Sequence, residues 1–273
     1  MHLRAASLLA PAVLVSVVGL VGLVGMAACS SAKTSAGGAT DAGDPGPTND
    51  AGVADSSPPV VVDAGPDPLL GCTKDPGAPA VTVDPNSATD PAGGAAAFTL
   101  AKALDGFPAT GGKLTAGIRT ENGGIKCALD EVAAPVSVAN FIGLARGTRP
   151  FKDDKGKWKT GHFYDGLLWH RVVPGFVIQG GDPDGLGSGG PGYDLVKENQ
   201  IAEPLGTLAM AASTQVSGSQ FYVVVGTGPK AEYNVFGTCD TDTAIAISNV
   251  PRDRDDAPNT PVHMLEVAIA RCP

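Results

Sequence analysis

The sequence predicts a mainly β domain, a closed barrel of short strands with helices at its ends, behind an export signal and a disordered tether. From residue 96 onward, short apolar segments are separated by Gly, Pro and Asp, as in a chain that turns often. Eight of these segments have the length and composition of strands, and the helical segments between them are brief. Many short strands with brief helices favour a barrel.

The predicted domain starts with a helix and a hairpin. Residues 96–104 are expected to form a short helix with one apolar side. Residues 113–120 and 124–129 are expected to be strands, and they flank Asn122-Gly123. Because Asn-Gly is typical of a tight hairpin turn, the two strands are expected to pair antiparallel.

A longer helix is expected from Ala134-Pro135 to Gly147, because proline is favoured in the first helical turn and glycine just after the last. Further strands are expected at residues 168–173, 176–179, 207–211, 221–225, 234–236 and 263–269, with a short helix at residues 241–248.

Residues 1–28 are predicted to be a secretory signal. Arg4 precedes an apolar run at residues 8–24, which closes on small residues. A transmembrane helix is the alternative, because a run of this length could just span a bilayer of ~30 Å. Residues 26–29 read MAAC and resemble the lipobox of bacterial lipoproteins, with Met26 where Leu is usual. This resemblance implies that Cys29 is lipidated and anchors the chain in the bacterial cell envelope, facing the periplasm or the exterior.

Residues 29–95 are predicted to be a disordered linker, and residues 96–273 the domain. From residue 30 to 95 there is no aromatic residue, and Asp-Ala-Gly occurs three times. The segment has nine aspartates and only two lysines. Such a segment cannot bury enough apolar surface to offset the entropy of ordering. The net charge of the whole chain is −9, so binding to a phosphate backbone is disfavoured and no nucleic-acid partner is expected.

The most specific motif lies at residues 163–182. Residues 163–166 read FYDG, and residues 170–182 read HRVVPGFVIQGGD. In the same order and spacing follow GTLAMA at 206–211, GSQF at 218–221 and VFG at 235–237. These segments resemble the cyclophilin family over about residues 112–271. The resemblance implies an antiparallel barrel of eight strands with two capping helices, and peptidyl-prolyl cis-trans isomerase activity on proline-containing polypeptides.

The chemistry of that activity matches the motif. Rotation about an X-Pro bond faces a barrier of ~18 to 20 kcal/mol, because amide resonance is lost at the twisted state. No bond is broken, so no nucleophile, metal or cofactor is required. What helps is an apolar slot for the proline ring, a donor aimed at the prolyl nitrogen, and polar groups that fix the preceding carbonyl.

The resemblance assigns nine residues to this site. Arg171, Phe176 and Gln179 are the expected catalytic set, with Arg171 as the donor. The expected substrate-binding residues are Val177 and Tyr222 as walls of the slot beside Phe176, Gln220 as a polar orienter beside Gln179, Ala211 and Ala212 along the peptide groove, and Tyr233 where His is frequent. The alternative for Arg171 is an ordinary strand residue paired with Asp182 or Glu198. His170 is expected to be a hydrogen-bonded barrel residue.

Four cysteines remain besides Cys29, an even number in a chain that looks exported, which favours two disulfides. Cys127 and Cys239 are expected to pair because they lie at strands expected to be neighbours. Cys72 and Cys272 flank the two ends of the domain and are expected to form the second pair. Free buried thiols are the alternative. The histidines are scattered, so no metal site is predicted.

Three function classes remain for a chain expected to be monomeric. They are an active isomerase of exported or envelope proteins, a cyclophilin-like peptide-binding module without catalysis, and a structural envelope lipoprotein. Residues 226–232 read GTGPKAE and lack the aromatic-or-His, Leu, Asp, Gly run that the family places there, which favours the second class. Arg171, Phe176 and Gln179 together favour the first, because a purely structural barrel needs no donor beside an apolar slot.

Overall fold

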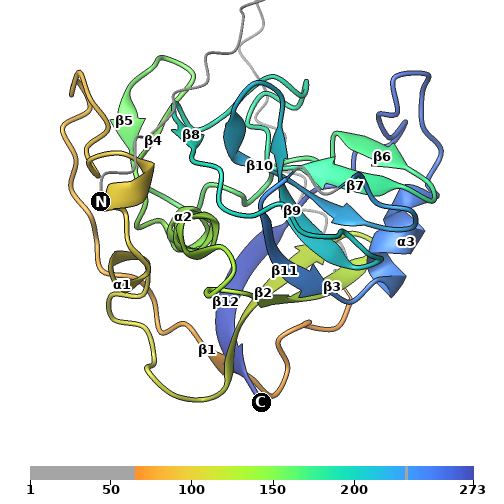
Figure 1. Cartoon of the computed structure of the whole chain (residues 1–273), viewed down its shortest axis with the longest axis horizontal. Helices are drawn as coiled ribbons and strands as arrows, with labels where there is room; N and C mark the ends of the chain where they lie inside the picture. The colour runs from red at the N-terminus through yellow and green to blue at the C-terminus, as the bar shows by residue number, and fades with distance from the viewer. Residues whose placement is uncertain (1–64, 231–232) are drawn as a thin grey trace, which may run out of the picture. The chain divides into compact units, whose positions relative to one another are not determined.

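The computed structural model of the chain describes residues 65–230 and 233–273 (Figure 1). The predicted signal, its transmembrane alternative, Cys29 and the linker up to residue 64 lie outside these residues. None of the helices that the structure describes is long and apolar enough to span a bilayer. In chain order the elements are β1 (Thr73–Lys74), a 3-10 turn (Ala95–Ala97), α1 (Leu100–Ala103), β2 (Lys113–Thr120), β3 (Gly123–Leu129), α2 (Pro135–Arg146), β4 (Phe151–Lys152), β5 (Trp158–Lys159), β6 (Arg171–Val173), β7 (Val177–Gly180), β8 (Asp194–Leu195), β9 (Thr207–Ala212), β10 (Val216–Val224), β11 (Val235–Cys239), α3 (Asp242–Ser248) and β12 (Glu266–Cys272).

One antiparallel sheet of ten strands organises the domain. Its strands follow the order β1-β12-β2-β3-β11-β9-β10-β7-β6, and β8 pairs with β10. The β2–β3 hairpin places Thr120 opposite Gly123, as the Asn-Gly pair predicts. Each of the eight predicted strands is present, at least in part, and the mainly β fold class with few helices is confirmed. No sequence pattern predicts the two-residue strands β1, β4, β5 and β8.

The hydrogen-bonded ladder does not close into the predicted barrel. Its end strands, β1 and β6, are not paired with each other. The segments just before β6 and β12 are joined instead by single bonds, from the Trp169 N–H to the Val262 carbonyl at 2.9 Å and from the Met264 N–H to the Leu167 carbonyl at 2.7 Å. Leu168 and His263 form an isolated antiparallel bridge between these bonds, and no continuous ladder joins the two segments among the described residues.

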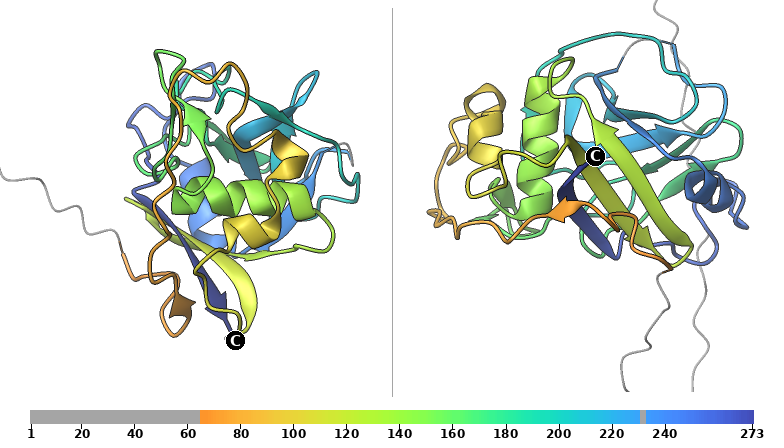
Figure 2. Two further views of the ribbon diagram at one scale, coloured as in Figure 1. Left: turned by 90° about the vertical axis from the view of Figure 1, so that its left-hand side faces the viewer. Right: turned by 90° about the horizontal axis from the view of Figure 1, so that it is seen from below.

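The helices lie on both sides of the sheet. Figure 2 shows α1 and α2 on one side of the strands and α3 on the other. α2 runs where it is predicted and is followed by Gly147 with φ 75°, the left-handed conformation that favours glycine after a helix. At its start, the N–H groups of Val136 and Ser137 donate to the Glu198 carboxylate at 2.7 and 2.8 Å. α1 is shorter than predicted, because the 3-10 turn replaces its first part.

Phe141 of α2 lies at the centre of the main core. Its ring centroid is 5.0 Å from that of Tyr164, 5.4 Å from that of Phe221 and 5.3 Å from that of Phe236, and all four side chains are fully buried. Aromatic pairs at this spacing stabilise a core beyond the area that they bury. They fix α2 against β10 and β11, two strands that also carry the site described below.

Residues 65–95, called the N-terminal segment below, are not the disordered tether that their composition predicts. β1 pairs with the end of β12, with Thr73 opposite Arg271. Leu69 is only 1% exposed and lies over Gly117 of β2, where any side chain larger than hydrogen would collide with it. The domain boundary predicted between residues 95 and 96 is therefore wrong, and this segment belongs to the domain.

Two arginines, one at the end of α2 and one three residues beyond it, explain why so polar a segment is fixed. The Arg146 side chain, 1% exposed, donates from Nε to Asp75 at 2.8 Å. The fully buried Arg149 side chain pairs with Asp90 at 2.6 Å. A buried charge without a partner is strongly unfavourable. Each buried arginine therefore favours the folded position of the aspartate that pairs with it. Composition alone cannot reveal this, because the partners lie outside the segment.

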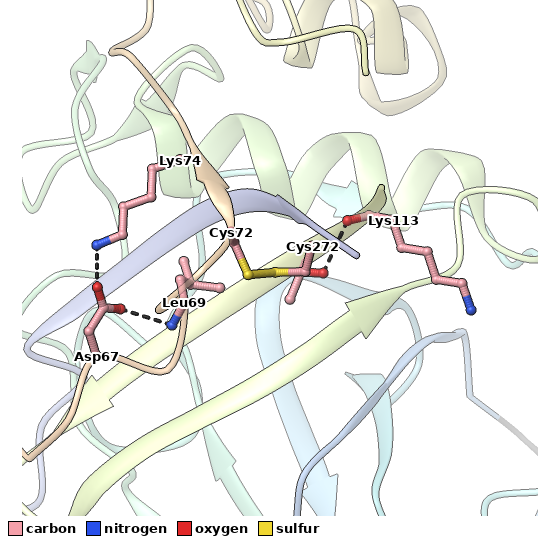
Figure 3. Close-up of a disulfide and its surroundings, with 7 residues drawn as sticks. Asp67, Leu69, Cys72, Lys74, Lys113 and Cys272 are labelled. Carbon is pink, nitrogen blue, oxygen red and sulfur yellow. Dashed lines mark hydrogen bonds and ion pairs between the residues drawn. A yellow bond between two sulfur atoms is a disulfide. The ribbon is translucent and has the colours of Figure 1, made fainter. Parts of the chain in front are cut away.

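Both predicted disulfides are present. Cys127 on β3 lies directly opposite Cys239 on β11, and Cys72 is bonded to Cys272. Figure 3 shows the second bond joining the start of β1 to the end of β12, beside the ion pair of Lys74 with Asp67. The predicted pairing is confirmed, and the alternative of free thiols is wrong for these four residues.

Candidate active site

Side chains of β10 alternate between the two faces of the sheet and so divide its apolar residues into two clusters. Phe221 points into the main core, whereas Tyr222 belongs to a separate cluster on the other face. We call the second one the outer cluster. Its buried members are Val177, Ala209, Tyr222, Val224 and Val235, with Phe176, Ala211 and Tyr233 packed against them.

The outer cluster contains five of the nine residues that the resemblance assigns to the site, among them the three expected walls of the proline slot. Phe176 lies just before β7 and Val177 is the first residue of that strand; Ala211 comes from β9, Tyr222 from β10, and Tyr233 from just before β11. The Tyr222 and Tyr233 rings are nearly perpendicular, with a centroid distance of 5.5 Å. Phe176, Ala211 and Tyr233 are only partly buried, so an apolar surface remains open to a ring from outside.

Polar side chains border this surface along the strand register. Gln179 on β7 lies opposite both Arg171 on β6 and Tyr222 on β10. Its side-chain amide donates to the Gln220 carbonyl oxygen at 3.0 Å, and the Gln220 amide donates to the Gly189 carbonyl at 2.8 Å. The two glutamines are therefore held in fixed orientations at the border of the outer cluster.

Arg171 has neither of the carboxylate partners that the ordinary-strand alternative assigns to it. Glu198 instead accepts from the start of α2, and Asp182 accepts the Asp184 N–H at 2.8 Å. The partner is Asp256, whose Oδ2 lies 3.7 Å from Arg171 Nη2. The guanidinium is also 5.9 Å from the centroid of the Phe176 ring, so it stands at the border of the outer cluster.

A cavity of about 690 Å³ adjoins this border. Four of the predicted site residues line part of it, Gln179, Ala211, Ala212 and Gln220. The glycine-rich loop after β7 lines another part. The structure thus places Ala212 at the rim of the cavity, next to Ala211, where a bound peptide could continue beyond the outer cluster.

Tyr222 makes a polar contact that no motif indicates. Its hydroxyl donates to the carboxylate of Glu203, which is 6% exposed. Burial, reinforced by this hydrogen bond, raises the pKa of the Tyr222 hydroxyl far above its ordinary value. The ring therefore stays neutral and anchored as a wall of the cluster. Glu203 lies in a loop between β8 and β9, where nothing in the local sequence connects it with β10.

His170, next to Arg171 in the chain, is 9% exposed. Neither of its ring nitrogens has a hydrogen-bond partner among the residues that the structure describes, so the predicted hydrogen bond is not found there. Burial lowers the pKa of the ring, so the imidazole is neutral near pH 7. The charge at the border of the cluster is therefore that of Arg171.

A guanidinium beside an open apolar surface, with two fixed amides, can bind a nonpolar ring and donate hydrogen bonds to the peptide groups next to it. The model of the cyclophilin type peptidyl-prolyl cis-trans isomerase family matches residues 115–269, and the chain belongs to this family. Membership of this family confirms the prediction that the chain is a peptidyl-prolyl cis-trans isomerase.

Several known proteins are similar to the chain. Peptidyl-prolyl cis-trans isomerase A of Mycobacterium tuberculosis is 41% identical over 168 residues, which cover 57% of this chain and 92% of the relative. A peptidyl-prolyl cis-trans isomerase of Synechococcus elongatus is 36% identical over 142 residues, covering 50% of this chain and 88% of the relative. The crystal structure of a cyclophilin type isomerase of Cryptosporidium parvum is 26% identical, covers 59% of this chain and 99% of its own, and has a TM-score of 0.48.

Proposed function

We propose that the chain catalyses cis-trans isomerisation of X-Pro bonds in exported or envelope proteins, with Arg171 as the donor. The observation that carries this proposal is the position of the Arg171 guanidinium, at the border of the outer cluster and 5.9 Å from the Phe176 ring. A cation partly exposed beside a partly open apolar surface is suited to a ligand that is apolar on one side and has an amide on the other.

The mechanism follows from the electronic structure of the amide. The outer cluster holds the proline ring, and Gln179 and Gln220 orient the peptide groups beside it. As the bond twists, conjugation is lost and the lone pair localises on the prolyl nitrogen. The guanidinium donates an N–H to that lone pair, an interaction that exists only in the twisted state and therefore lowers the barrier. No covalent bond forms or breaks in this step.

The test is an isomerisation assay of the purified chain on X-Pro peptides. The chain is expected to accelerate isomerisation, and Arg171→Ala is expected to retain about 1% of that rate enhancement. A wild-type chain that accelerates no X-Pro peptide would overturn the proposal.

A peptide-binding module is the second candidate. The segment at residues 226–232 lacks the aromatic residue that the family resemblance implies, and Tyr233 lines that side of the cluster instead. A chain that binds proline peptides with micromolar affinity and leaves their isomerisation rate unchanged would select this candidate over the enzyme.

We propose an envelope location on separate grounds. The two disulfides suit an oxidising compartment, and Cys29 stands in a lipobox-like sequence at the end of a signal-like segment. Cys29→Ser is expected to release the protein from membranes; retention of a full-length chain would support the transmembrane alternative.

A further inference from the structure

The loop between α3 and β12 reaches the strand that carries Arg171. Residues 252–256 read RDRDD, and the Val172 N–H of β6 donates to the Asp256 carbonyl at 2.8 Å. This bond fixes the backbone of Asp256 against β6, one residue from the proposed donor. Asp256 is 85 positions away from Arg171 in the chain, so only the fold brings them together.

The backbone of Asp256 is held in an unfavourable conformation. Its φ is 66°, and among the described residues it is the only one other than glycine with a positive φ. Such a conformation persists where the surroundings determine it, and it is frequent at functional sites. Here the Asp253 carboxylate accepts the N–H groups of Asp255 and Ala257, each at 2.9 Å, and so fixes the loop on both sides.

The Asp256 carboxylate faces two arginines. Its Oδ1 accepts from Arg252 Nε at 3.2 Å, and its Oδ2 lies 3.7 Å from Arg171 Nη2. The other charges of the loop are directed elsewhere: Asp253 accepts from the backbone, and Asp255 pairs with Arg254 at the surface. Arg171 is thus attracted through one oxygen at a distance longer than a hydrogen bond, which leaves its N–H groups free to donate to a substrate.

We propose that Asp256 is a positioning residue that holds the Arg171 guanidinium at the border of the outer cluster before substrate arrives. The inference rests on the proposed function of Arg171. An arginine side chain loses much rotamer freedom when it is ordered, and a carboxylate on a fixed loop accounts for part of that cost in advance. Because both side chains are about one third exposed, the effect is modest, and loss of the carboxylate lowers kcat by about two- to fivefold.

Two variants separate the effect of the Asp256 charge from the effect of its backbone conformation. Asp256→Asn keeps the shape and tolerates a positive φ, so only the charge is lost. It is expected to lower kcat by about two- to fivefold with KM unchanged. Asp256→Gly relieves the backbone, so its Tm is expected to be equal to or above that of the wild type while kcat falls at least as far. If Asp256→Gly has a higher Tm and yet a lower kcat, the loss of turnover cannot be caused by a less stable fold.

Two controls complete the experiment. Arg252→Gln frees the carboxylate for Arg171 and is expected to leave kcat undiminished; a fall equal to that of Asp256→Asn would assign the effect to the loop and overturn the inference. In the Arg171→Ala background, Asp256→Asn is expected to have no further effect, and a second independent loss would also overturn it. If Arg171→Ala has the kcat of the wild type, the proposed function fails. If Arg171→Ala lowers kcat and Asp256→Asn does not, only the inference about Asp256 fails.

Discussion

The N-terminal segment and the strands under the outer cluster are held in place by different interactions. β10 pairs with β9 on one side and β7 on the other, and the three strands bury apolar side chains on both faces. The N-terminal segment makes a two-residue ladder, one disulfide and ion pairs with the arginines near the end of α2. The order of the strands is encoded by the local alternation of their side chains. The order of the N-terminal segment depends on partners far away in the sequence. A segment poor in apolar residues can therefore be fixed when the rest of the domain supplies its partners.

The largest expected effect tests this dependence. Asp90→Ala removes the partner of the buried Arg149 side chain and is expected to cost about 3 to 5 kcal/mol of unfolding free energy. Thermal unfolding is expected to shift down by about 10 °C. Lys74→Gln is the control, because its pair with Asp67 is exposed and its loss is expected to cost under about 1 kcal/mol. Equal shifts in the two variants would mean that burial of the pair does not matter.

The strands under the outer cluster are expected to show the opposite behaviour. Arg171→Ala is expected to lower kcat/KM by about 10²-fold, equivalent to about 3 kcal/mol, while Tm stays at the wild-type value, because the side chain is 37% exposed. Arg171→Lys is expected to restore little, since a compact ammonium lacks the planar fork. A loss of stability as large as the loss of turnover would make Arg171 a structural residue.

The disulfide of the N-terminal segment comes next. The double substitution Cys72→Ser and Cys272→Ser is expected to lower the unfolding free energy by about 2 to 4 kcal/mol, because the unfolded chain gains freedom. Isomerase activity at a temperature below unfolding is expected to stay near wild type, since neither cysteine contacts the outer cluster. Denaturant curves and rate measurements on the same samples check both statements; a selective loss of activity would contradict the separation of the two regions.

The smallest expected effect concerns His170. Burial lowers the pKa of its ring below the ordinary 6.5, so below that pH the unfolded state binds more protons than the folded state. Stability is therefore expected to fall as the pH drops from 7 to 5, and His170→Gln is expected to flatten the dependence of Tm on pH over that range. An unchanged slope in the variant would assign the pH dependence to other groups.

The same contrast explains what the sequence could predict. The Asn122-Gly123 turn and the helix begun by Pro135 depend on local chemistry, and both are found where expected. Five members of the outer cluster are expected from the family resemblance, which rests on short motifs of contiguous residues; Ala209, Val224 and Val235 are not predicted. Asp256 and Glu203 could not be predicted in this way. Each lies in a loop whose sequence has no periodicity, and each meets its partner only after the strands have assembled.

The bond between Cys72 and Cys272 has a mechanical consequence. These two residues are 200 positions apart, and Cys272 is the penultimate residue of the chain. A force applied between residue 71 and the C-terminus therefore passes through a single covalent link and leaves every strand from β2 to β11 unloaded. A protein pulled in this way keeps the strands under the outer cluster folded until the disulfide is reduced.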